Sequence, residues 1–129
     1  FILKDFMVPI VESPVVYEKD LSFQSILKTI EQGQLGFCLV LGNNHEFVGL
    51  ISNADVRKAL LRSLDNLNNI DVTTMINKVA IGIEENATVN DMLQLIKKQS
   101  FPVTYLPIWD KNKNAVGIVT FVNLIRGEI

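Results

Sequence analysis

Two stretches of the chain place apolar residues at positions i, i+3, i+4 and i+7, the spacing that gives a helix one apolar face. The members of the first stripe are Phe23, Ile26, Leu27 and Ile30, and those of the second are Val89, Met92, Leu93 and Ile96. Val89 follows Phe23 by 66 positions. This spacing predicts two helices that occupy equivalent places in an internal repeat.

Each predicted helix is preceded by a hydroxyl residue suited to cap its first turn. Ser22 precedes the first stripe and Thr88 precedes the second. Asp91, three residues after Thr88, adds the acidic partner of a capping box. Gly33 is placed to end the first helix.

After each helix come an apolar run, a polar turn and a second apolar run, which predicts a β-hairpin. The first hairpin has its runs at 37–41 and 47–51, and the second has them at 105–109 and 115–119. Helical patterns follow at 53–64 and at 121–127, and short β-prone segments precede the repeats at 14–17 and 79–83.

Both halves therefore read strand, helix, strand, strand, helix. Because a unit of this size is marginal alone, we expect the two halves to pack on each other. The predicted fold is α+β, with a first repeat and its lead-in at 1–64, a connection at 65–70 and a second repeat at 71–129.

Composition and charge narrow the possible functions. The chain has 129 residues, 48% of them hydrophobic, and a net charge of −2 with a pI of about 5.3. That sign argues against a protein that binds nucleic acid by neutralising phosphates. No apolar run is long enough to span a membrane, and the single cysteine fits a reducing compartment, so we expect a cytoplasmic protein. Because the sequence starts at Phe1 rather than Met, we also expect it to be part of a longer protein.

Residues suited to catalysis are few. Cys38 lies in an apolar run and is predicted to be a core thiol, whereas His45 lies in a polar turn and is predicted to be exposed. The sequence has no Cys-x-x-Cys zinc motif, no nucleophile elbow and no glycine-rich phosphate loop. It therefore favours a protein without catalytic activity of its own, which needs neither a metal nor a permanent cofactor.

A strand that ends in a hydroxyl residue and leads into a helix occurs twice, at 49–55 and at 117–123. In the simpler interpretation, Ser52 and Asp55 cap a helix. In the alternative interpretation, the helix start binds phosphate, Ser52 donates to a phosphate oxygen, and Asp55 accepts from a sugar diol. Arg57, Lys58 and Arg126 then supply positive charge, although they also suit a solvated face.

The repeated units, each closing in Gly-hydrophobic-hydrophobic-Ser/Thr-x-x-Asp/Asn, resemble a pair of cystathionine β-synthase (CBS) domains over essentially the whole chain. The resemblance implies two β-α-β-β-α repeats that pack through three-stranded sheets with pseudo-twofold symmetry. It also implies two clefts that bind adenosine nucleotides or related ligands. No nucleic acid or membrane partner is implied.

The resemblance assigns the phosphate and ribose roles to Ser52 and Asp55 in the first repeat, and to Thr120 and Asn123 in the second. Asn123 departs from the family pattern, because an amide lacks the charge-assisted acceptor of a carboxylate. Contacts to a base, through side chains or main chain, fall by position to Val15, Val16, Leu39, Val40, Ile81, Pro107 and Ile108. Trp109 could stack on a base, but packing within its hairpin is the favoured interpretation.

A narrower likeness concerns the parent protein. The segments 35–37 and 49–58 and the ending at 123–127 are similar to the C-terminal CBS pair of arabinose 5-phosphate isomerase-type sugar-phosphate isomerases. This implies a fused catalytic domain, a regulatory adenine nucleotide or CMP-sugar, and a homodimer. The alternative hypothesis is a structural dimerisation module that binds no ligand.

Overall fold

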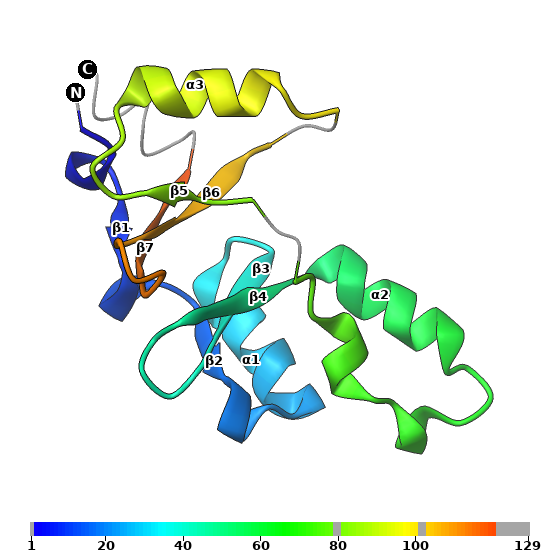
Figure 1. Cartoon of the computed structure of the whole chain (residues 1–129). Coiled ribbons are helices and arrows are strands. Elements are labelled where there is room, and N and C mark those ends of the chain that lie inside the picture. The colour runs from blue at the N-terminus through cyan, green and yellow to red at the C-terminus, as the bar shows by residue number, and fades with distance from the viewer. Residues whose placement is uncertain (1, 79–80, 101–102, 121–129) are drawn as a thin grey trace. The chain divides into compact units, whose positions relative to one another are not determined.

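The structure, a computed structural model, describes residues 2–78, 81–100 and 103–120 (Figure 1). Each of the three helices within these ranges begins at a residue that closes a capping box. The helices are α1 (Phe23–Gly33), α2 (Asn53–Arg62) and α3 (Val89–Lys97). The boxes pair Ser52 with Asp55 and Thr88 with Asp91, and at α1 a second serine, Ser25, takes the acidic residue's place opposite Ser22. Short 3₁₀ turns lie at Leu3–Asp5, Ile10–Glu12, Glu18–Asp20, Leu67–Asn69 and Val72–Met75.

Helix α1 ends at Gly33, as predicted, but the glycine does not supply the left-handed residue that follows the helix. Gly33 is still helical, and the next residue, Gln34, takes the left-handed conformation at φ 57°. A Cβ on Gly33 would lie 2.7 Å from Cβ of Pro14. The glycine therefore permits a close approach of the segment that leads into the first strand, rather than a turn.

Chain contacts divide the molecule into two units, of which one, repeat unit A, is the continuous segment Pro14–Ala80. Its sheet has the order β2-β3-β4, with strands β2 (Val15–Tyr17), β3 (Phe37–Leu41) and β4 (Phe47–Ser52). β2 runs parallel to β3, which is antiparallel to β4. One face of the sheet packs on α1 and α2 in a core whose members are Val16, Ile26, Ile30, Cys38, Val40, Ile51, Val56, Ala59 and Met75.

Repeat unit B consists of Phe1–Ser13 and Ile81–Ile129. Its sheet has the order β1-β7-β6-β5, with strands β1 (Val8–Pro9), β5 (Ile83–Glu84), β6 (Tyr105–Trp109) and β7 (Ala115–Thr120). The described core members are Leu3, Met92, Val103, Leu106, Ile108 and Val119. This sheet has four strands, whereas the CBS resemblance implied three.

The fourth strand comes from the N-terminal lead-in, which the sequence analysis placed with the first repeat at 1–64. Val8 pairs with Ile118 of β7, and the Leu3 side chain is fully buried in the core of unit B. The division by contacts thus differs from the expected boundaries, because the lead-in of one repeat completes the sheet of the other.

In unit A, an equivalent segment pairs with the corresponding strand, β4. Asn77 and Leu50 exchange both main-chain hydrogen bonds, at 2.7 and 3.1 Å. Leu50 occupies the same place in β4 as Ile118 does in β7, both one residue after the motif glycine. The segment before each repeat therefore lies beside the last strand of a unit.

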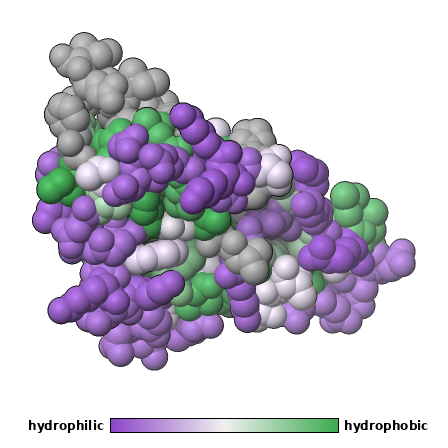
Figure 2. All heavy atoms as spheres, turned by 45° about the horizontal axis from the view of Figure 1, so that its top comes forward, coloured by the Kyte–Doolittle hydropathy of each residue, from purple (hydrophilic) through white to green (hydrophobic). Residues whose placement is uncertain are grey.

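The predicted α+β class and both hairpins are confirmed. The predicted helix at 121–127 lies outside the described residues. None of the helices within the described ranges is long and apolar enough to cross a membrane. On the face drawn in Figure 2, hydrophilic residues predominate and apolar residues show in separate patches.

Candidate functional site

Ser52 and Asp55 lie where β4 passes directly into α2. The Ser52 hydroxyl accepts from the Asp55 amide at 3.2 Å and donates to Asp55 Oδ2 at 2.9 Å. The same carboxylate oxygen accepts from the Ser52 amide at 2.9 Å. Both side chains are partly exposed, so a ligand can reach them.

This arrangement closes the helix start without any ligand. Besides the Asp55 amide, the Asn53 amide is also engaged, because it donates to the Gly36 carbonyl at 3.0 Å. A phosphate oxygen would therefore have to replace Asp55 as the acceptor of the Ser52 hydroxyl proton. Arg57 and Lys58 are exposed in the following turn, where a long basic side chain can reach an anion at the helix start.

The pairing of the strands decides which candidate side chains share a face with Ser52. Val15 is opposite Leu39, and Ser52 is opposite Phe37, two residues before Leu39. Since directly paired residues and alternate residues of a strand point to the same face, Val15, Leu39 and Ser52 lie on one face of the sheet. Val16 and Val40 point to the other.

That other face is the helix-covered core of unit A. Val16 is 4% exposed and Val40 is fully buried there. Their side chains are committed to packing, which leaves only main-chain atoms of these residues for a ligand. Leu39, on the face of Ser52, is also fully buried, whereas the Val15 side chain on that face is partly exposed.

Val15 also has main-chain groups at the edge of the sheet. The Leu39 amide donates to the Pro14 carbonyl at 2.8 Å, so the parallel ladder uses Pro14 and Val16 on this side of β2. The Val15 amide and carbonyl then point away from β3, and β2 is the edge strand of its sheet. Val15 thus presents a main-chain donor and a main-chain acceptor side by side. Its side chain lies on the same face of the sheet as Ser52.

Repeat unit B places its candidates in the same register. Thr120 is opposite Tyr105 as Ser52 is opposite Phe37, and Thr120 is partly exposed. Ile108 is fully buried in the core of the unit, Ile81 packs against that core, and Pro107 lies on the opposite face. Asn123 and Arg126 lie outside the described residues, so their roles stay predictions.

Trp109 is held by its own unit. A Cβ on Gly82 would lie 2.6 Å from Cη2 of its ring, and Lys113 Nζ lies 4.9 Å from the ring centroid. The ring thus packs against one neighbour and carries a cation–π contact with another. This arrangement supports packing within the hairpin rather than stacking on a base.

The remaining reactive side chains do not converge. Cys38 is fully buried, and burial raises the pKa of its thiol to about 12. His45 is exposed, with Nδ1 3.3 Å from the Tyr17 hydroxyl. In the part of the chain that the structure describes, no group of three His, Cys, Asp or Glu side chains is placed to hold a metal ion.

A polar hollow beside the start of α2 was missed in the sequence analysis. Its volume is about 230 Å³, and its lining residues are Ile30, Glu31, Gln34, Gly36 and Asn53. Gly36 takes φ 81°, and a Cβ there would lie 3.6 Å from the Asn53 side-chain nitrogen. The sequence signal was the glycine itself, which lets the loop between α1 and β3 turn back toward α2.

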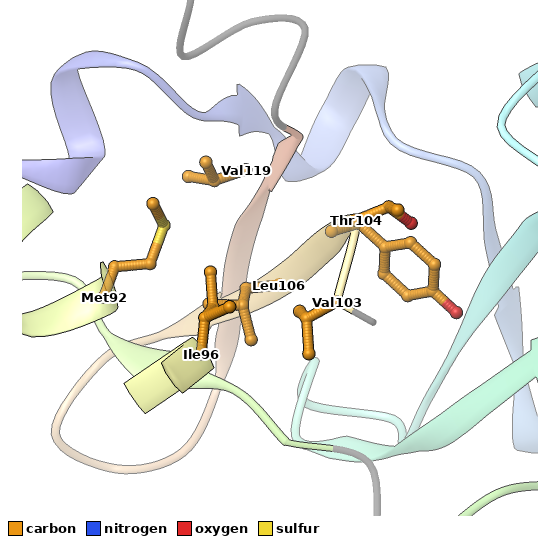
Figure 3. A pocket seen from close by; sticks show the side chains of 7 residues that line it. Met92, Ile96, Val103, Thr104, Leu106 and Val119 are labelled. Carbon is orange, nitrogen blue, oxygen red and sulfur yellow. The ribbon is translucent and has the colours of Figure 1, made fainter. Parts of the chain in front are cut away.

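Unit B contains a smaller hollow of about 10 Å³. Figure 3 shows it between α3 and the strands β6 and β7, with Met92, Ile96, Leu106 and Val119 around it. Ligand pockets are typically about 300–1,000 Å³ in volume, so this hollow is too small for a nucleotide.

Comparison with known proteins gives matches along the whole chain. The family model described as "CBS domain" matches residues 3–62 and 71–128. An uncharacterized protein of Methanocaldococcus jannaschii, MJ1426, is 24% identical, with 99% of this chain and 91% of that protein covered. The carnitine transport ATP-binding protein OpuCA of Listeria monocytogenes is 27% identical over 88% of this chain, which spans only 26% of that protein.

Solved structures agree in fold. The structure of CBSX2 in complex with AMP has a TM-score of 0.80 at 21% identity, covering 99% of this chain and 96% of that one. The structure of CbpB in complex with c-di-AMP has a TM-score of 0.79 at 17% identity, covering 99% and 84%. At these identities the likeness establishes the fold.

Proposed function

The chain belongs to the CBS domain family, and from this premise we propose that it is a regulatory module that binds an adenine nucleotide through repeat unit A. The observation that carries the proposal is the shared face of Ser52, Leu39 and Val15, next to the main-chain edge of Val15. The complexes of CBSX2 with AMP and of CbpB with c-di-AMP support the choice of ligand class.

Each part of the nucleotide has a counterpart in this arrangement. The Val15 amide and carbonyl complement the acceptor and donor of the adenine edge, and the partly exposed Val15 side chain offers apolar surface to the ring. The ribose hydroxyls donate to Asp55, while the Ser52 hydroxyl turns from Asp55 to a phosphate oxygen. Arg57 supplies the positive charge.

Binding of the phosphate breaks one hydrogen bond of the capping box and makes one carboxylate acceptor available to the ribose. The phosphate must displace the hydrogen bond of 2.9 Å between the Ser52 hydroxyl and Asp55 Oδ2. The carboxylate, left with an open lone pair, then accepts from a ribose hydroxyl, so no acceptor is lost in the exchange. A free phosphate has no diol to donate to Asp55, so it would meet the uncompensated negative charge of this carboxylate. The site therefore favours nucleosides with a 2′,3′-diol.

Regulation requires that the nucleotide bind one arrangement of the protein better than another. We propose that the regulated part is an attached sugar-phosphate isomerase domain in a cytoplasmic homodimer, supported by the resemblance of segments 35–37 and 49–58. A CMP-sugar remains a second ligand of this proposal. The match to OpuCA, a protein about four times as long as the aligned part, supports attachment to a larger protein.

A dimerisation module without ligand is the second candidate. Leu27 and Leu93, which hold the same position in the two repeats, remain 45% and 40% exposed on α1 and α3. An apolar side chain repeated on two helix faces suits contact with a second copy. Sedimentation that shows a dimer with or without nucleotide would favour this function.

Isothermal titration of the chain with AMP, ADP, ATP, c-di-AMP and a CMP-sugar tests the proposal. We expect saturable binding of an adenine nucleotide, weakened at least about tenfold by Ser52→Ala combined with Asp55→Ala. The matched control is Thr88→Ala with Asp91→Ala, which removes the equivalent capping box of α3 and should leave the affinity unchanged. Ser52→Thr keeps both the cap and the hydroxyl and should retain binding; absence of heat with every ligand would contradict the proposal.

A further inference from the structure

The side of α2 that faces away from the core carries an exposed leucine between cations. Val56 and Ala59 are buried in the core of unit A. Leu61 follows Arg57 by four residues and Lys58 by three, which places the three side chains together on the opposite face of the helix. Leu61 is 61% exposed, although an isolated unit would gain by burying it.

Two leucines that follow α2 in the sequence are also exposed. Leu64, in the turn after the helix, is 65% exposed, and Leu67, in the next 3₁₀ turn, is 53% exposed. We name the α2 outer face as Arg57, Lys58, Leu61 and Arg62, together with Leu64 in the turn directly after the helix. In Figure 2 an apolar group stands out among hydrophilic ones on the side of the molecule that carries α2.

The charge of this surface is opposite to that of the whole protein. Within 57–67 the sequence has three cations and one carboxylate, Asp65, whereas the chain as a whole has a net charge of −2. None of the carboxylates that the structure describes forms an ion pair with Arg57, Lys58 or Arg62. Arg57, Lys58 and Arg62 are also exposed, so a partner can reach them.

The charges of the α2 outer face also indicate which kind of partner it can bind. A twofold contact places the same patch on both partners, so a second copy on this face would bring six cations together against two carboxylates. A membrane-surface helix is longer and carries bulky aromatic side chains, whereas this face has no aromatic residue and Ser63, Asp65 and Asn66 interrupt it. Leucines flanked by cations complement the leucines and carboxylates of an acidic amphipathic helix.

We propose that the α2 outer face docks an acidic amphipathic helix of a partner protein. The leucines supply apolar area at the centre of the contact, and the cations at its rim set the orientation and the association rate. This site lies on the solvent side of α2 and goes beyond the nucleotide function, which uses the start of the helix.

The probe is a fluorescein-labelled synthetic peptide of Glu and Leu, about 18 residues long, with Leu at helical spacing, and anisotropy measures its binding to the 129-residue chain. We expect saturable binding that weakens from about 50 mM to about 300 mM salt. Leu61→Ser with Leu64→Ser should weaken it at least about tenfold, as should Lys58→Glu with Arg62→Glu. Arg57 stays unchanged because the proposed function assigns it to the nucleotide phosphate, and peptide binding rather than nucleotide affinity is the readout of the Lys58 variant.

The matched control is Lys97→Glu with Lys98→Glu, which makes the same change of net charge on exposed residues of α3 and should leave peptide binding unchanged. Circular dichroism confirms that each variant is folded. The proposal is overturned by equal binding of all variants, by equal binding of a Gln/Leu peptide, or by no binding. It is also overturned if the leucine variant abolishes a dimer in sedimentation, or abolishes cosedimentation with phosphatidylcholine/phosphatidylglycerol vesicles.

Discussion

The main-chain carbonyl oxygen of Asn77 lies 2.6 Å from the position that a Cβ on Gly49 would occupy. Gly117, the equivalent residue of the second hairpin, has the carbonyl of Val8 in the same place. The glycine that opens each Gly-hydrophobic-hydrophobic-Ser/Thr motif thus serves the packing of an incoming segment. The phosphate-binding role that we propose belongs to the hydroxyl residue three positions later.

The first prediction concerns this glycine. Gly49→Ala should lower the free energy of unfolding by about 1–3 kcal/mol, because the added methyl group meets backbone that cannot move independently. Urea unfolding measures the change. Gly42→Ala is the control in a turn: there a Cβ would meet the Glu46 side chain, a flexible group that can swing aside. Equal losses in the two variants would contradict the assigned role of Asn77.

The second prediction concerns the lead-in. Leu3→Ala should destabilise the protein by about 2–5 kcal/mol, since the side chain is fully buried in the core of unit B. Val11→Ala, at a residue 89% exposed in the same segment, should change stability by less than about 0.5 kcal/mol. Thermal unfolding distinguishes the two, and a silent Leu3→Ala would show that the lead-in does not pack on this unit.

The third prediction concerns the capping boxes. Ser22→Ala and Ser52→Ala each remove the acceptor for an amide in the first turn and should each cost about 1 kcal/mol of stability. Only Ser52→Ala should also weaken nucleotide binding. If both variants lost stability and both lost binding, the effect at Ser52 would be explained by unfolding rather than by contact with the ligand.

The fourth prediction follows from burial of the single cysteine. Its pKa of about 12 lies above that of an exposed thiol, so the neutral form is favoured in the folded state. The contribution to stability is complete at neutral pH and is lost as the pH rises toward 12. Ellman's reagent at about pH 8 should label native protein at least about a hundredfold more slowly than protein in guanidinium. Equal rates would contradict burial.

Much of the local structure could be predicted because its signals are short-range. The stripe from Phe23 to Ile30 and the hydroxyl at Ser22 locate α1 to the residue at its start. The polar turns between the apolar runs locate both hairpins. At the other end, the sequence located the last helical residue, Gly33, but not its close approach to Pro14, which depends on tertiary packing.

The faces of the sheets could not be predicted. β3 reads Phe-Cys-Leu-Val-Leu and is buried at every position, so no alternation distinguishes the side of Leu39 from the side of Val40. Without that register, Val16 and Val40 were placed among ligand contacts beside Val15 and Leu39. The pairing with β2 and β4 separates them.

Strand pairing between residues far apart in the sequence could not be predicted either. β1 is two residues long and contains a proline, and its partner is at the far end of the sequence. Nothing periodic in residues 2–9 indicates a strand. The hollow beside Gln34 and Asn53 was missed for a related reason, because it forms only where the loop after α1 meets the start of α2.

Amide chemical shifts of the isotope-labelled chain during titration with AMP test the central claim most directly. The account predicts saturable shifts for the amides of Val15, Ser52 and Asp55, which lie at the base, phosphate and ribose positions, while the Thr88 and Asp91 amides of the equivalent α3 cap stay in place. Binding that shifts the α3 cap but leaves Val15 and Ser52 unmoved, or no shift at all, would contradict it.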